Sequence, residues 1–218
     1  MTFQLGLVGK DCLLLGSDRK QRVTPTIFRG EEQYSEFIGQ QKIKMNPERT
    51  IAVACSGSDV VWESAEKVLG AEGAASSSAE WLEKMIKIGE SRPATSWRDK
   101  ILVVRSGHTG EFIRIDMGER TLEIKDKITS GLPLAAAYFL KRYYRQSLRF
   151  EAVRKLALLV LDCGAQESPE NVGYGYDLLA IRDGAIQSVE TVQEDGHEII
   201  EIRSRMESAI RDILLRGQ

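Results

Sequence analysis

The fold is decided by residues 2–20, which read TFQLGLVGKDCLLLGSDRK. Two short apolar runs, 3–8 and 12–15, are separated by Gly9-Lys10-Asp11. Short apolar runs on either side of a glycine-containing turn are typical of a β-hairpin. The sequence therefore predicts a hairpin that begins almost at the first residue, with Thr2 directly in front of its first strand.

Outside this hairpin, the chain groups its strands into hairpins and its helices into pairs. Strand-like runs bounded by turn residues are expected at 42–45, 50–56, 101–105, 111–116, 121–124, 176–181 and 185–190, with a brief pairing at 198–202. Helical spacing is expected at 57–69, 79–88, 133–146, 149–165 and about 204–215. This order argues against alternating βαβ units and predicts antiparallel sheets covered by paired helices. No linker divides the chain, so we expect one domain over residues 1–218.

Composition excludes several classes of function. The chain has 218 residues, of which 42% are hydrophobic and 28% charged, and its net charge is −2. This balance gives no basic footprint for nucleic acid. No apolar run approaches the roughly 18 residues that span a bilayer, and the N-terminus lacks a signal-peptide pattern. Three cysteines and two histidines in unrelated contexts make a zinc site improbable. We therefore expect a cytoplasmic protein without membrane, nucleic-acid, metal or cofactor binding.

Thr2 is the residue whose position suggests chemistry. Removal of Met1 would leave Thr2 with a free α-amine beside its own hydroxyl, and the strand that follows would hold both. An α-amine has an unperturbed pKa of about 7.7–8.0, so it can accept the hydroxyl proton near neutral pH. Threonine activated in this way is a known nucleophile. The alternative is a small residue that only favours removal of Met1.

Three segments together resemble the proteasome β-subunit family, most closely its bacterial homologues. The first is residues 2–20, in which Asp18 follows Thr2 by sixteen residues, as an aspartate follows the family's catalytic threonine. The second is Lys42-Ile43, and the third is the segment SGLPLA that starts at Ser130. The resemblance implies an α+β fold, the four-layer αββα sandwich of the N-terminal-nucleophile hydrolases.

The resemblance also implies a threonine endopeptidase with a defined site. Thr2 would be the nucleophile, Lys42 would stabilise its alkoxide, Asp18 would pair with Lys42, and Ser130 would hydrogen-bond near the terminal amine. The residues implied in oxyanion and substrate binding are Cys55, Val53 and Gly131. A strand-end turn remains the alternative for Asp18, and a helix N-cap the alternative for Ser130.

The sequence departs from the family pattern in several places. Cys55 falls where the family has the oxyanion-hole glycine, and we expect its side chain to narrow the approach unless a length change moves Gly57 there. Lys44 lies on the same strand face as Lys42 and competes for its role. The segment between Asp18 and Lys42 is longer than in the family. The family's late Asp-x-x-Ser element is not recognisable, and Glu167 or Glu170 stands as a possible substitute for its aspartate.

The family resemblance further implies assembly into rings, peptide or unfolded-protein substrates and a possible ATPase or unfoldase partner. We expect that only Met1 is removed, rather than a longer propeptide. Two alternatives remain open: a transpeptidase or ligase that uses the same threonyl ester, and a catalytically silent scaffold subunit.

Overall fold

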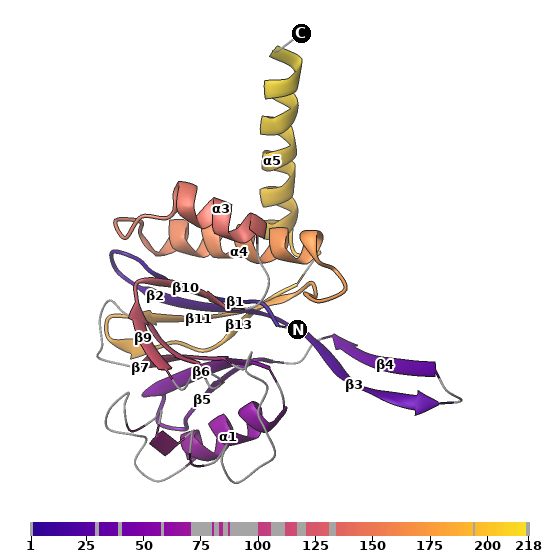
Figure 1. Cartoon of the computed structure of the whole chain (residues 1–218). Coiled ribbons are helices and arrows are strands. Elements are labelled where there is room, and N and C mark those ends of the chain that lie inside the picture. Colours follow the sequence, from indigo (N-terminus) through magenta and orange to yellow (C-terminus); the bar gives the residue numbers. More distant parts are fainter. Residues whose placement is uncertain are drawn as a thin grey trace.

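The computed structural model has four layers (Figure 1). It describes residues 2–28, 31–38, 41–57, 59–70, 80, 83–84, 87, 100–105, 112–116, 121–130, 134–193 and 195–216. Helices α3 (Leu134–Tyr143) and α4 (Phe150–Glu167) form one outer layer, and α1 (Asp59–Gly70) lies on the opposite side. Two sheets lie face to face between them, which is the predicted αββα arrangement.

The first sheet contains the N-terminal hairpin and has the strand order β10-β1-β2-β11-β12, with β13 also paired to β11. Its strands are antiparallel and comprise β1 (Gln4–Val8), β2 (Leu13–Asp18), β10 (Lys127–Ser130), β11 (Tyr176–Arg182), β12 (Ala185–Ile186) and β13 (Glu190–Val192). The predicted first hairpin is confirmed. The expected strand at 185–190 is instead two short strands that both pair with β11.

The second sheet is antiparallel and has the order β5-β6-β7-β8-β9. Its strands are β5 (Ile43–Met45), β6 (Ile51–Ser56), β7 (Lys100–Arg105), β8 (Phe112–Asp116) and β9 (Thr121–Lys125). The β5–β6 turn is closed by Asn46, whose side-chain oxygen accepts bonds from the backbone N–H groups of Thr50 and Ile51 at 2.8 and 2.9 Å. The strands predicted for this half of the chain are therefore confirmed.

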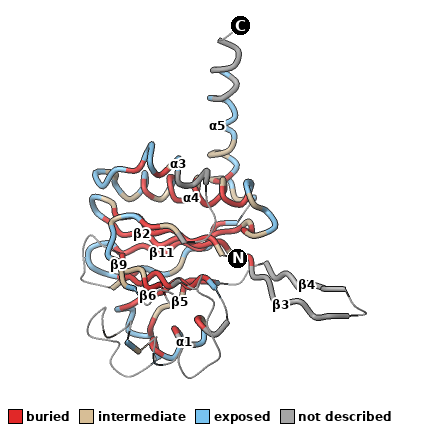
Figure 2. Tube along the Cα trace, viewed as in Figure 1, coloured by how far each residue is buried: buried red, intermediate tan, exposed pale blue. Residues whose placement is uncertain are grey.

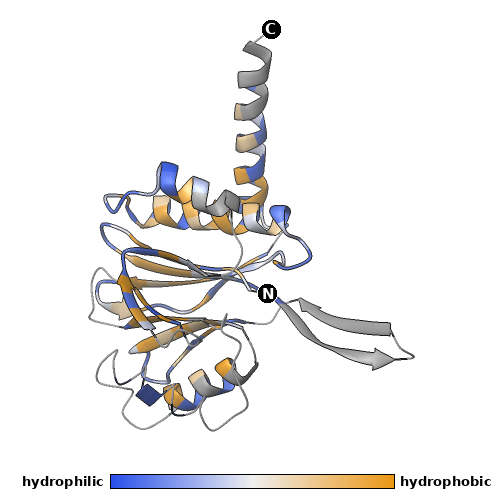
Figure 3. Ribbon diagram, in the orientation of Figure 1, coloured by the Kyte–Doolittle hydropathy of each residue, from blue (hydrophilic) through white to orange (hydrophobic). Residues whose placement is uncertain are grey.

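Side-chain alternation along β1 separates two parts of the core. Phe3, Leu5 and Leu7 pack with the residues under α3 and α4, whereas Val8 packs in the cluster between the sheets. Figures 2 and 3 show the resulting buried and apolar interior of both sheets. Gly6 faces the second sheet, and a Cβ there would lie 2.8 Å from the Phe112 ring. At Gly6 the two sheets therefore pack too closely to leave room for a side chain.

The C-terminal helix α5 (His197–Arg216) begins earlier than predicted. The expected pairing at 198–202 is wrong, because these residues form the first turns of α5. Ile199 is fully buried, and the Arg203 guanidinium donates to Asp162 of α4 at 2.7 and 2.9 Å, so the helix is anchored at its start. The far end of α5 extends away from the sandwich (Figure 1). In the described part of the chain, no helix combines the length and apolar character needed to cross a membrane.

A hairpin that the sequence did not suggest projects from the sandwich. Strands β3 (Lys20–Phe28) and β4 (Glu31–Ile38) pair only with each other, with a register shift between Val23 and Thr26. In Figure 1 this ribbon extends from the edge of the sandwich near the N-terminus. The expected helix at 79–88 falls mostly outside the described residues.

Candidate active site

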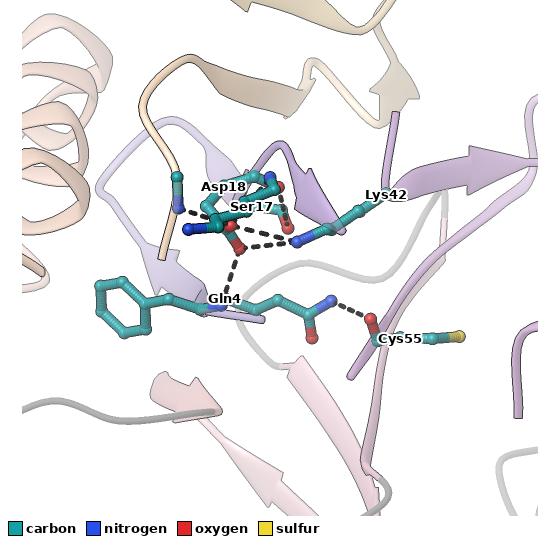
Figure 4. Close-up of polar contacts among 8 residues, drawn as sticks. Gln4, Ser17, Asp18, Lys42 and Cys55 are labelled. Carbon is teal, nitrogen blue, oxygen red and sulfur yellow. Dashed lines mark hydrogen bonds and ion pairs between the residues drawn. The ribbon is translucent and has the colours of Figure 1, made fainter. Parts of the chain in front are cut away.

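Asp18 is the centre of a buried polar cluster at the end of β2. Its Oδ1 accepts a hydrogen bond from the Phe3 backbone N–H at 2.7 Å. Its Oδ2 accepts from the backbone N–H groups of Lys20 at 3.0 Å and Gly173 at 3.1 Å. The Lys42 ammonium lies 3.0 and 3.1 Å from the two oxygens (Figure 4). Asp18 is fully buried, so these donors replace the water that the carboxylate loses on folding.

The β1–β2 register brings the start of the chain to this carboxylate. Gln4 pairs with Ser17, and the Asp18 N–H donates to the Phe3 carbonyl at 3.0 Å. The backbone of Phe3 is therefore bonded to Asp18 in both directions. Thr2, which is half-buried, is directly attached to this fixed point.

Lys42 lies immediately before β5 and is buried between the layers. Burial lowers the pKa of its ammonium below the ordinary value, whereas the charge and hydrogen bonds of Asp18, and then the charge of Asp177, act to raise it. An uncompensated buried charge is costly, so the Asp18 pair is what allows a cation at this position.

Lys44, the competing residue, lies elsewhere. Its ammonium forms an ion pair with Glu66 of α1 at 3.1 Å, and its side chain is 39% exposed. The two lysines are two residues apart, Lys42 just before β5 and Lys44 within it, and of the two only Lys42 reaches Asp18. The geometry therefore favours Lys42 over Lys44.

Cys55 and Val53, both on β6, have buried side chains that face α1. They pack in the cluster that includes Val61 and Ala65 of that helix. The expectation that the Cys55 side chain narrows the approach to the site is therefore wrong, because side chains alternate along β6 and this one points away from the first sheet.

The Cys55 backbone, in contrast, faces the first sheet. Its carbonyl accepts a 2.6 Å hydrogen bond from Nε2 of the buried Gln4 (Figure 4). Ser130 ends β10 and stands in register with Gln4 on β1, while Gly131 lies outside the described residues. The start of β1, the end of β10 and β6 thus converge near Asp18 and Lys42.

The loop after α4 reaches Asp18 through its backbone. Gly173 donates its N–H to Asp18, and Lys20 Nζ donates to the Pro169 carbonyl at 2.8 Å. Gly173 must be glycine, because a Cβ there would lie 2.3 Å from the Lys20 Cβ. Glu167 and Glu170, the expected substitutes for the family's aspartate, are both exposed.

Neither glutamate takes part in the described hydrogen bonds of Asp18. Glu170 instead accepts hydrogen bonds from the side chains of Ser168 and Asn171. The described contact of this loop with Asp18 is made by a backbone N–H, that of Gly173. Sequence reasoning missed Gly173, although a glycine close to the start of a predicted strand marks close backbone approach.

Asp177 is another buried carboxylate, and it lies on β11, the strand that pairs with the Asp18 strand β2. It stands in register with Ser17 of β2, and its Oδ1 accepts from the Thr191 hydroxyl at 2.9 Å. Arg19 lies 3.6 Å from the same oxygen. Burial raises the pKa of Asp177 above its ordinary value of 3.8, against the opposing effects of Thr191, Arg19 and Lys42. Sequence reasoning missed this residue because it sits inside an apolar strand pattern.

Comparison with known proteins identifies solved structures that share this fold. No family model matches the chain, and no curated protein matches its sequence. The structure is similar to the solved "Helical Assembly of the Anbu Complex from Pseudomonas aeruginosa", with a TM-score of 0.78, 17% identity and coverage of 98% of this chain and 96% of that one. The chain has the Anbu fold.

Two further Anbu structures agree. The Gly-1 mutant of Anbu from Hyphomicrobium sp. strain MC1 matches with a TM-score of 0.77 at 11% identity, covering 98% of this chain and 97% of that one. Anbu, described as an ancestral β-subunit, from Yersinia bercovieri matches with a TM-score of 0.76 at 13% identity, covering 98% and 96%. The predicted fold class, the αββα sandwich of the N-terminal-nucleophile hydrolases, is confirmed.

The expected resemblance to a proteasome β-subunit, most like a bacterial proteasome homologue, is wrong at the level of the family. The structural neighbours are Anbu proteins, which are proteasome-like but distinct. The residues that suggested the proteasome family, Thr2, Asp18, Lys42 and Ser130, lie on or directly beside strands of the sandwich, so their spacing reports the fold of this chain rather than its family.

The raised pKa of Asp177 predicts a pH-dependent effect of Asp177→Asn. In the wild type the folded state holds this proton more tightly than the unfolded state, so the carboxyl costs stability as pH rises from 3.8 through its folded pKa. Asparagine does not titrate. The stability of wild type relative to the variant should therefore be greater at pH 4.5 than at pH 7.5, as measured by urea unfolding at both values.

Asp183→Asn is the matched control, because Asp183 is an exposed turn residue with φ of 51°, which asparagine also adopts. A stability difference for Asp177→Asn that is the same at both pH values, or that changes no more than that of Asp183→Asn, would contradict the prediction.

Proposed function

We propose that the chain is a threonine-type N-terminal-nucleophile hydrolase that cleaves peptide bonds once Met1 is removed. One observation carries this proposal: a single buried carboxylate, Asp18, binds both the Phe3 N–H and the Lys42 ammonium. The residue next to Thr2 and the buried cation are thereby held by the same group. The substrates we propose are peptides and unfolded segments of protein.

In the proposed reaction, Thr2 Oγ attacks the carbonyl carbon of the scissile bond. The Thr2 α-amine takes the hydroxyl proton and later passes it to the leaving amine, which departs as the C–N bond breaks and a threonyl ester remains. Water then attacks the ester, the α-amine accepts a proton from that water, and the threonine oxygen recovers a proton as the acid product leaves. Atoms and charge balance without any further reactant.

Lys42 supports this chemistry through its charge. A nearby cation lowers the pKa of the α-amine, which favours its neutral, proton-accepting form, and stabilises negative charge on Thr2 Oγ. Asp18 keeps the ammonium in place through two hydrogen bonds. Side chains alternate along β1, so that Phe3 and Leu5 face the helices and Gln4 faces β6. If the alternation continues to Thr2, its side chain lies on the same face as that of Gln4.

The proposed oxyanion donor is a backbone N–H near Cys55. In an extended strand, the N–H and C=O of one residue project toward the same edge. The Cys55 carbonyl is bonded to Gln4 of β1, so its N–H also projects toward the edge that Gln4 approaches. A preorganised backbone N–H of this kind is worth about 10²–10³-fold in rate in other acyl-transfer enzymes. Cysteine is acceptable here because its side chain packs under α1.

Removing the hydroxyl tests the mechanism directly. Thr2→Ala should lower kcat/KM on fluorogenic peptides by at least about 10³-fold, because no oxygen remains to form the ester. Thr2→Ser should retain part of the activity, since its hydroxyl and α-amine both survive. Intact mass must show that Met1 is absent from each preparation. Full activity of Thr2→Ala would overturn the mechanism.

The two lysines form a matched pair for a second test. Lys42→Met should reduce kcat/KM by at least about 10²-fold, because it removes the charge beside Thr2 and leaves Asp18 with an unpaired buried carboxylate. Lys44→Met should change it by no more than about 2-fold, because exposed ion pairs contribute little. If Lys44→Met lowered kcat/KM more than Lys42→Met did, the assignment of the active-site cation to Lys42 would be wrong.

We further propose that the protein self-associates through the outer face of α3. Tyr138 and Tyr143 are 62% and 54% exposed, and both rings pack against Phe139, with centroids 5.7 and 6.1 Å away. Exposed aromatic clusters of this kind are enriched at interfaces. The neighbour from Pseudomonas aeruginosa is itself a helical assembly. An enclosed or wound assembly would restrict access to an otherwise unselective threonine protease.

Light scattering at micromolar concentration should therefore give a mass several times 24.4 kDa. The double variant Tyr138→Ser, Tyr143→Ser should shift the mass toward the monomer, with an unchanged urea midpoint as the control for folding. A monomeric wild type, or a double variant that assembles normally, would contradict the interface. Negative-stain images of the assembled fraction distinguish closed rings from helical filaments.

A further inference from the structure

Asp177 is a buried carboxylate that has no part in the proposed reaction. It lies on β11 in register with Ser17 of β2, and its side chain is fully buried. Leu179 and Ile181 of the same strand pack in the cluster between the sheets, so by alternation the Asp177 side chain faces the second sheet. An acid at such a position is unfavourable unless neighbouring groups replace the water that it loses.

The groups around Asp177 compensate for its burial only in part. Burial raises the pKa of the carboxyl above its ordinary value, and three neighbours oppose this change. The Thr191 hydroxyl donates to Oδ1 at 2.9 Å, and the Arg19 guanidinium lies 3.6 Å from the same oxygen. Lys42 acts as a hydrogen-bond donor through its backbone and as a positive charge through its ammonium. Buried acids with shifted pKa values are concentrated at functional sites, and here one neighbour is the proposed active-site lysine.

Two carboxylates on neighbouring strands act on Lys42. Asp18, at the end of β2, accepts hydrogen bonds from the ammonium at 3.0 and 3.1 Å. Asp177 comes from β11, which pairs with β2 and lies against β5, the strand that follows Lys42. Burial lowers the pKa of Lys42, while the charges of Asp18 and then Asp177 raise it and that of Lys20 lowers it. Asp177 is thus the second anion that favours a cation at this buried position.

We infer that Asp177 is a positioning residue for the active-site cation: it holds the start of β5 against the first sheet and favours the charged form of Lys42. Asp18 acts on the ammonium, and Asp177 acts through its charge and through the Lys42 backbone. A neutral lysine cannot stabilise a Thr2 alkoxide, so Asp177 extends the reaction to higher pH. This inference rests on the proposed function, and it assigns Asp177 no contact with substrate.

The pH dependence of Asp177→Asn tests this role. Asparagine keeps the shape of the side chain and an oxygen that accepts from Thr191, but it carries no charge. The basic limb of the kcat/KM profile reports loss of the Lys42 proton, and in the variant it should lie about one pH unit lower, because one anion near the cation is gone. Loss of packing alone would lower kcat/KM equally at every pH. Asp183→Asn, the exposed control, should leave the profile unchanged.

A double-mutant cycle tests the interaction without reference to activity. Asp177→Asn and Lys42→Met, singly and together, are compared with wild type by urea unfolding at pH 8. The double variant should be destabilised less than the sum of the single variants, by at least about 5-fold in the unfolding equilibrium constant, because the two residues interact. The same cycle with Lys44→Met should be additive, since Lys44 pairs with Glu66. Asp177→Ser, also uncharged, replaces Asp177→Asn if the latter does not fold.

The outcomes separate this inference from the proposed function. Wild-type protein without Met1 that hydrolyses no peptide overturns the proposed function and the catalytic part of the inference, and the cycle then decides alone whether Asp177 holds Lys42. An additive cycle with Lys42→Met overturns the inference. An active Asp177→Asn variant whose basic limb coincides with that of wild type overturns it as well.

Discussion

The buried ion pair between Asp18 and Lys42 is the interaction on which the site depends. The carboxylate accepts bonds from Phe3, Lys20, Gly173 and Lys42, so four segments meet at one group. Removing one member of a buried pair commonly costs about 3–5 kcal/mol, because the other charge is left without a partner. Such a pair is a weak source of net stability, but it specifies where its partners must lie. Here it specifies the position of the residue that follows Thr2.

The two sheets present their groups to this centre in different ways. The first sheet brings Thr2, Gln4 and Asp18 through the β1–β2 register, in which each pairing determines which face a side chain takes. The second sheet contributes backbone at Cys55 and the Lys42 side chain just before β5. A side-chain-to-backbone bond joins the two. The site is thus a property of the interface between the sheets, which explains why its polar members are buried.

Much of this arrangement could be predicted from the sequence, for identifiable reasons. The β1–β2 hairpin follows from two apolar runs around Gly9-Lys10-Asp11. Asp18 was proposed from its sixteen-residue spacing to Thr2, and Lys42 from the resemblance of the Lys42-Ile43 pair. Gln4 and Asp177 could not be found in this way, because a single polar residue inside a strand pattern carries no signal until its partner is known. The family was wrong because motif spacing along this chain reports where its strands lie, which is a property of the fold and does not by itself identify a family.

The β3–β4 hairpin gives the ion pair a further consequence. Asp18 precedes this ribbon, Lys42 follows it, and the two are separated by 24 positions in the chain. The ion pair therefore joins the two chain segments that lead into and out of the hairpin, at its base. Once a loop is closed at its base, doubling its length costs only about 0.6 kcal/mol in closure entropy. The length of the ribbon can consequently change at little cost in closure entropy while the ion pair still closes its base.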